Sequence, residues 1–152
     1  MISRSPSAGP LQAAIRIGAG LYWLYFASRA WNGVAWMQPL MVQSAVQNPI
    51  PGLHELLLQV VVPHWFGFAL AFAVAQTLVG LLLLLGLLCR WAAWVGVLLA
   101  LCLALTVGFL EPELGRRWLF YLAVLVNLAC VVGGPGALAG ERLRGVPRWL
   151  RS

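Results

Sequence analysis

The sequence predicts an all-α protein, a bundle of four membrane-spanning helices with short interfacial helices in one long outer loop. Apolar residues make up 62% of the 152-residue chain and charged residues 9%, against about 45–50% and about 25% in soluble domains. This small number of charges cannot cover the surface of a soluble domain, which excludes that class. The high apolar fraction excludes intrinsic disorder. The arginines flank the apolar runs, which favours a membrane over a nucleic-acid partner.

Four apolar runs meet the length of about 20 residues that a helix needs to cross a hydrocarbon core of about 30 Å. We expect spans at about residues 11–31, 65–88, 91–110 and 118–137. Arg16 interrupts the first run, which argues against a cleaved signal peptide. The strictly apolar part of the fourth run ends at Val132, and the glycines and proline that follow predict its end near the interface.

Residues 32–64 form the one sizeable loop, on the outer side. Its four prolines (Pro39, Pro49, Pro51 and Pro63) divide it into pieces too short to span a membrane. We expect two short helices, Leu40–Gln47 and Leu53–Val62, lying at the outer interface and covering the bundle. The whole chain is then a single membrane domain that ends in a tail, residues 138–152.

The arginines predict the orientation. The cytoplasmic side of a membrane protein carries an excess of basic residues, and four spans divide the ten arginines seven to three. One side has Arg4, Arg16, Arg90, Arg142, Arg144, Arg148 and Arg151, and the other has Arg29, Arg116 and Arg117. We therefore expect a multi-pass protein of the bacterial cytoplasmic (inner) membrane with both termini in the cytoplasm. Its basic tail would contact anionic lipid.

A stripe of small residues recurs every four positions along the third run. It consists of Ala92, Gly96, Ala100, Ala104 and Gly108. Small residues let membrane helices approach closely. The stripe predicts a packing face, either inside this bundle or against another membrane subunit of a larger complex.

Three polar side chains lie inside apolar runs, where such groups are often functional. Arg16 is near enough to the inner end to reach the headgroups with its long side chain. Gln76 and Asn127 fall at similar depth in the second and fourth runs, so a hydrogen bond between them is one interpretation. A role in handling a ligand or a proton is the other.

Three residues gather at the outer ends of the first two runs, namely Arg29, His64 and Trp65. Hydrogen-bond donors beside an apolar slot suit a quinone ring, so these residues are a candidate quinone site. Anchoring at the interface is the alternative.

The remaining reactive residues predict no catalytic centre. Cys89, Cys102 and Cys130 form no CxxC motif, so they are either small core residues or a redox pair. With only His54 and His64, we expect no metal site of several ligands, although a haem or a chlorin magnesium could take one histidine.

Three segments resemble the DoxX/DoxD family of small four-helix membrane proteins. They are Ile15–Gly20 with Tyr25–Arg29, Gln76–Gly80 with Leu84–Arg90, and the proline-bearing outer loop, which is similar to the DoxD branch. The resemblance covers Leu11 to Val132 and implies a respiratory-chain setting, because DoxD-like proteins are the quinone-linked membrane subunits of thiosulfate:quinone oxidoreductases. In two positions the chain departs from the pattern: Gln76 replaces the acid of the signature, and Arg29 stands where the family often has lysine.

Two functions follow as expectations. The first is a membrane-embedded subunit of a quinone-linked electron-transport assembly, possessing no catalytic constellation of its own. The second is a non-catalytic accessory subunit that stabilises a larger respiratory or photosynthetic complex.

Overall fold

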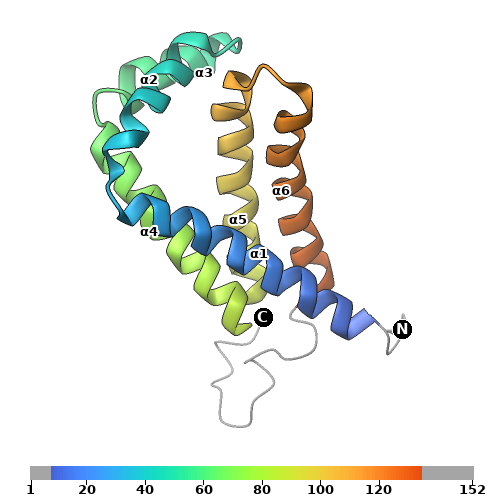
Figure 1. Cartoon of the computed structure of the whole chain (residues 1–152). Helices are drawn as coiled ribbons and strands as arrows, with labels where there is room; N and C mark the ends of the chain where they lie inside the picture. Colours follow the sequence, from blue (N-terminus) through green and yellow to red (C-terminus); the bar gives the residue numbers. More distant parts are fainter. Residues whose placement is uncertain (1–7, 135–152) are drawn as a thin grey trace.

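The computed structural model describes residues 8–134, and within that range the chain is helical and has no strand (Figure 1). The α-helices are α1 (Ala8–Trp31), α2 (Met37–Gln47), α3 (Pro51–Leu56), α4 (Trp65–Leu85), α5 (Cys89–Leu105) and α6 (Leu114–Gly133). Two segments, Trp65–Leu85 and Cys89–Leu110, are long and apolar enough to cross a membrane. The all-α prediction is confirmed, and these two segments support association with a membrane.

The four long helices α1, α4, α5 and α6 alternate in direction (Figure 1). One end of the bundle holds the tight turn between α4 and α5, and we call it the hairpin end. The opposite end carries α2 and α3, which arch over it, and we call it the cap end. The helix α1 packs mainly on α4, and α5 packs mainly on α6.

The turn at the hairpin end begins earlier than the apolar pattern predicts. Gly86 adopts the left-handed conformation (φ 71°), and its N–H donates to the carbonyl of Leu82 at 2.9 Å. The N–H of Leu87 donates to the same carbonyl at 3.0 Å. This is the glycine-terminated helix end that stops α4 at Leu85, rather than at the predicted Leu88.

The other helix ends also differ by a few residues from the prediction. The helix α5 is followed by a 3-10 turn at Val107–Leu110, so the third run is helical almost throughout. The helix α6 starts at Leu114 instead of 118 and ends at Gly133, after which Gly134 has φ 69°. The predicted continuation to 137 and the basic tail 138–152 lie outside the described residues.

The cap is two short helical segments, as predicted, and it is fastened to α5. The first of them begins at Met37 rather than at the predicted Leu40, so Pro39 lies in the first turn of α2 instead of before it. Pro51 occupies the first turn of α3, where a missing N–H is tolerated, and α3 continues into a π turn at Leu57–Val61. The side chain of Asn48 donates to the carbonyl of Leu105 at 2.8 Å, and His54 Nδ1 lies 2.7 Å from the carbonyl of Ala45. These bonds position α2 and α3 over the cap end.

Small residues let the long helices come close together. The stripe of small residues lies on α5 and on the 3-10 turn that follows it. All five of its members are buried, namely Ala92, Gly96, Ala100, Ala104 and Gly108. A Cβ added to Gly20 of α1 would lie 2.9 Å from the backbone N of Leu84 and 3.0 Å from the carbonyl O of Gly80. Backbone therefore meets backbone where α1 crosses α4.

Candidate functional site

Arg16 is buried and binds the end of a neighbouring helix. Its side chain is 1% exposed, and its Nη1 donates to the carbonyls of Leu83 at 2.8 Å and Leu84 at 3.3 Å. The last carbonyls of a helix have no intrahelical donor and carry partial negative charge, so a guanidinium is a favourable partner. Arg16 thus fastens α1 to the C-terminus of α4 and does not extend to the surface.

Asn127 is bonded to a residue that the sequence does not single out, Trp23. The indole Nε1 of Trp23 donates to Asn127 Oδ1 at 3.1 Å, and Asn127 Nδ2 donates to the carbonyl of Ala123 at 2.8 Å. Both side chains are fully buried. A Cβ on Gly96 would meet both of them, so the bare backbone of α5 makes room for the pair.

Gln76 is buried in the middle of α4, and it does not bond to Asn127 as one interpretation proposes. Its side chain is 2% exposed, and its Oε1 has no hydrogen-bond partner among the residues that the structure describes. Asn127 instead bonds to the indole of Trp23 and to the carbonyl of Ala123.

The predicted trio Arg29, His64 and Trp65 lies at the cap end, but each side chain has a separate neighbour. The guanidinium of Arg29 is 5.5 Å from the ring centre of Trp36. His64 Nδ1 is 3.0 Å from the carbonyl of Val60, and Trp65 packs beside an apolar cluster that includes Ala30, Met37, Ala69 and Ala73. None of the three lines either cavity described below.

A cavity of about 610 Å³ lies between α1 and α6. The residues that α1 contributes follow one another at intervals of three or four positions, apart from one adjacent pair, so they lie on one face of the helix. The opposite wall comes mainly from α6. The lining residues are Ile15, Gly18, Ala19, Tyr22, Phe26, Glu111, Leu119, Phe120, Leu122, Ala123, Val126 and Asn127. We call it the α1–α6 cavity. Nearer the hairpin end, Gln12 Nε2 donates to the carbonyl of Ala129 at 2.9 Å and holds the two helices together.

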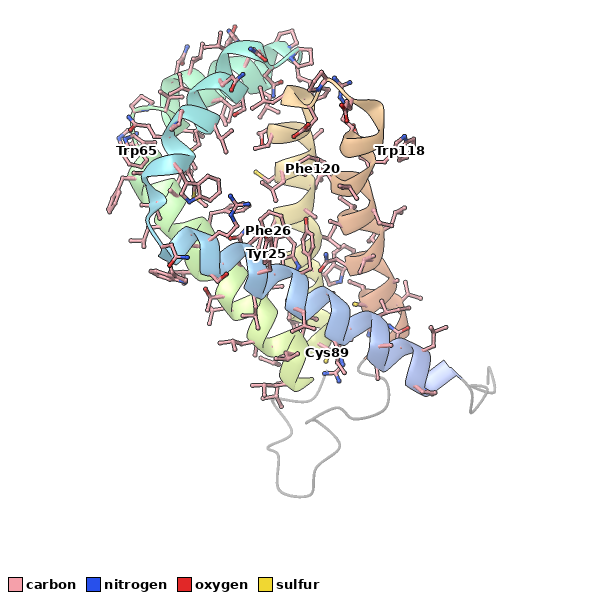
Figure 2. All side chains as sticks on the ribbon, in the orientation of Figure 1. Tyr25, Phe26, Trp65, Cys89, Trp118 and Phe120 are labelled. Carbon is pink, nitrogen blue, oxygen red and sulfur yellow. The ribbon has the colours of Figure 1, made fainter. Side chains whose placement is uncertain are left out.

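Aromatic rings and a few polar atoms line this cavity. Tyr22 and Phe26 are ring neighbours, with centres 4.9 Å apart, and Phe120 comes from the opposite wall (Figure 2 labels both phenylalanines). The hydroxyl of Tyr22 has no hydrogen bond to another described residue. With Asn127 and Glu111 as the other polar residues, the cavity has the composition of a small-molecule site, apolar with few polar groups.

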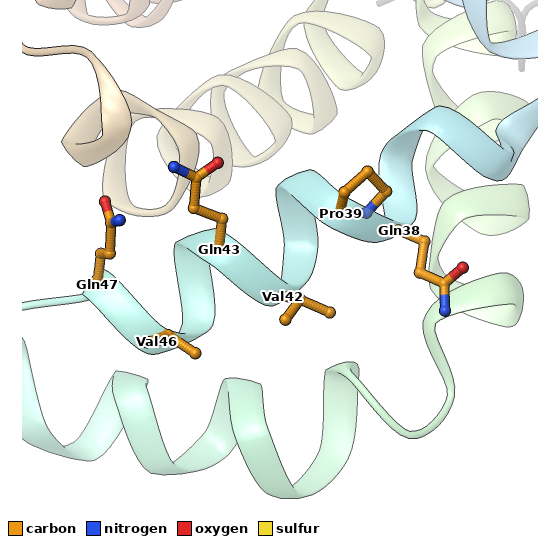
Figure 3. Close-up of a pocket in the computed structure, with 6 residues that line it drawn as sticks. All are labelled: Gln38, Pro39, Val42, Gln43, Val46 and Gln47. Carbon is orange, nitrogen blue, oxygen red and sulfur yellow. The ribbon is translucent and has the colours of Figure 1, made fainter.

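A second hollow, of about 490 Å³, is only an open surface beside α2. It is lined by Gln38, Pro39, Val42, Gln43, Val46 and Gln47, all from that one helix (Figure 3). Since no second element closes it, it cannot enclose a ligand.

The structure describes no group of three or more His, Cys, Asp or Glu residues that could hold a metal within residues 8–134. Cys89 and Cys130 are buried thiols, and Cys102 is exposed on α5. All three are free cysteines.

Comparison with known proteins leaves the function to the geometry. No protein-family model, no curated protein and no solved structure matches this chain. Of the two hollows described above, the α1–α6 cavity is the more enclosed.

Proposed function

We propose that this chain is a membrane-embedded subunit of a quinone-linked electron-transport assembly and that it binds the quinone in the α1–α6 cavity. The cavity is the observation that carries the proposal. Its volume of about 610 Å³ falls within the usual range of small-molecule sites, roughly 300–1,000 Å³. The resemblance to DoxD-like proteins supplies the class of ligand.

In this proposal α1, α4, α5 and α6 all span a bacterial inner membrane, with both termini and the hairpin end in the cytoplasm. The segments α4 and Cys89–Leu110 have the required length and hydropathy, and Arg117–Gly133 is apolar but shorter. Large apolar side chains on the outer faces support a lipid surround, for example Leu98 at 64% and Leu125 at 60% exposed. The seven-to-three division of arginines supports the orientation.

A reporter that is active only outside the cytoplasm tests this topology. Inserted after Gln47 at the cap end, it should give signal, and inserted after Leu87 at the hairpin end, it should give none. The opposite pattern would reverse the orientation, and signal at both positions would exclude four spans.

The walls of the α1–α6 cavity suit the parts of a quinone. Tyr22, Phe26 and Phe120 offer ring faces and edges to a flat ring, which aromatic side chains contact favourably. The hydroxyl of Tyr22 is a donor for a quinone carbonyl. The apolar side chains of both helices, such as Ile15 and Val126, give a surface for the isoprenoid tail.

Gly18 gives a direct test of the site. A Cβ added there has no neighbour within 4 Å, so Gly18→Leu places a side chain in the cavity without displacing backbone. In purified full-length protein we expect a tailed benzoquinone to bind at least about tenfold more weakly, a difference of about 1.4 kcal/mol.

Gly67→Leu is the matched control for this test. Gly67 is also an exposed helical glycine with no neighbour within 4 Å of an added Cβ, but it lies on α4 outside the cavity. It should leave quinone affinity unchanged. Equal affinity in wild type and Gly18→Leu would remove the cavity as the quinone site.

The accessory role remains the second candidate, and one surface favours it. Trp91, Trp94 and Leu98 are exposed at helical spacing along a single face of α5. Such a face can contact lipid or a neighbouring subunit. Three results together would favour the accessory role: other subunits co-purify with the wild-type chain, Trp94→Ala abolishes that co-purification, and the purified chain binds no quinone.

A further inference from the structure

We infer that the α1–α6 cavity prefers the reduced, hydroxyl-bearing form of its ligand, a hydroquinone, over the quinone, and that Glu111 sets this preference. The inference rests on the proposed function, since it concerns the same cavity. It follows from which hydrogen-bonding groups the cavity wall offers.

Glu111 is held at the edge of the cavity by the first turn of α6. It directly follows the 3-10 turn Val107–Leu110 in extended conformation, and the residue is half-buried and lines the cavity. Arg117 Nε donates to the backbone carbonyl of Glu111 at 2.9 Å. This bond ties the residue to α6, so the carboxylate is carried on a fixed segment.

Among the lining residues, Glu111 alone has a side chain that only accepts hydrogen bonds when ionised. An ionised carboxylate has about four acceptor positions and no donor, so it can accept a further bond beside the contacts it already makes. The hydroxyl of Tyr22 both donates and accepts, so it serves either redox form. The Asn127 amide has its oxygen bonded to Trp23 and donates to Ala123.

A hydroquinone and a quinone differ in whether their oxygens can donate a hydrogen bond. The hydroxyl of a hydroquinone donates to a carboxylate, and a hydrogen bond to a charged group is roughly twice as strong as a neutral one. A quinone carbonyl only accepts hydrogen bonds. Beside an ionised carboxylate, which also only accepts, it could form no hydrogen bond. Sites that bond a hydroxyl reject analogues lacking it, by about 10⁴ or more when fully enclosed. For the half-buried Glu111 we expect a preference of about tenfold.

The experiment compares two probes on the purified full-length chain. The probes are a benzoquinol with a ten-carbon tail and the corresponding benzoquinone, measured without oxygen by equilibrium dialysis. Wild type should bind the quinol about tenfold more tightly. Glu111→Gln should reduce the ratio to within about threefold, because an amide donates as well as accepts. Glu111→Asp, which keeps the carboxylate, should retain a preference for the quinol.

Glu113→Gln is the matched control, because this glutamate is close in sequence and exposed but does not line the cavity. It makes the same charge change and should leave the ratio as in wild type. Equal affinity of wild type for the two probes, or a ratio that Glu111→Gln does not change, would overturn the inference.

Gly18→Leu separates this failure from failure of the proposed function. If it weakens both probes while the ratio is insensitive to Glu111, the cavity still binds the ligand and only the preference is wrong. If it weakens neither probe, the cavity is not the site, and both proposals fall together.

Discussion

Replacing Gly96 by alanine tests whether the buried Trp23–Asn127 pair depends on bare backbone in α5. The added Cβ would lie 2.9 Å from Asn127 Cγ and 3.2 Å from Trp23 Nε1, and closer still to Asn127 Oδ1. Real Cβ atoms do not approach a side chain this closely, so Asn127 must move. Its hydrogen bond with Trp23 would then be lost.

The structure gives the size of the effect. An interhelical hydrogen bond in a membrane contributes about 0.6–1.7 kcal/mol, and overpacking a tight contact costs about 1–3 kcal/mol. Alanine regains about 1 kcal/mol of helix propensity over glycine. We therefore expect Gly96→Ala to lower the free energy of unfolding by about 0.6–3.7 kcal/mol.

Buried thiols provide the assay. In a Cys102→Ser background, the remaining cysteines, Cys89 and Cys130, are buried and react with a fluorogenic maleimide only when the bundle opens. Gly96→Ala should react at a lower temperature or detergent-denaturant concentration than the parent. Gly18→Ala is the control, because its Cβ has no neighbour within 4 Å. If the two variants are equally stable, the close packing at Gly96 does not support the pair.

Three further predictions use the same thiol assay. Arg16→Leu should lower the free energy of unfolding by about 1.5–3 kcal/mol, because hydrogen bonds to charged groups contribute that much, and Arg16→Lys should lose less; a Leu variant as stable as wild type would contradict the role of the guanidinium. Gly20→Ala should destabilise by about 1–3 kcal/mol and by more than Gly80→Ala, because the nearest neighbour of the first Cβ is α4 backbone and that of the second is a leucine side chain; the reverse order would refute this. A double-mutant cycle of Trp23→Phe and Asn127→Leu should give a coupling of about 0.6–1.7 kcal/mol, and additive effects would show that the bond contributes nothing.

Most of the fold could be predicted because apolar run length and proline spacing are local properties. The four long helices lie on the four apolar runs, and Pro51 marks the start of α3. Their exact ends could not be predicted from hydropathy alone. Leu87 and Leu88 read as part of an apolar span, yet the left-handed Gly86 before them ends α4. The hydropathy of a leucine is the same in a helix and in a turn.

The candidate site was harder to predict because it depends on how helices are oriented about their axes. A tryptophan in an apolar run reads as an anchor or as core, and only the packed structure shows that Trp23 reaches Asn127. Likewise, Tyr22 and Phe120 are nearly 100 positions apart, and only the packing of α1 beside α6 brings them to one cavity. Arg29, His64 and Trp65 share an end of the bundle, but their side chains contact different neighbours.

The bond from Arg16 to α4 has a consequence for the order of biosynthesis. The carbonyl of Leu83 that accepts it lies 67 residues further along the chain, which a ribosome adding about 5–20 residues per second reaches only after roughly 3–13 s. An arginine costs about 2.5–3.5 kcal/mol at the centre of a membrane helix, and Arg16 lies nearer the hairpin end of α1, where it bonds to α4. During synthesis, α1 can therefore form its bond to α4 only after the end of α4 has been made.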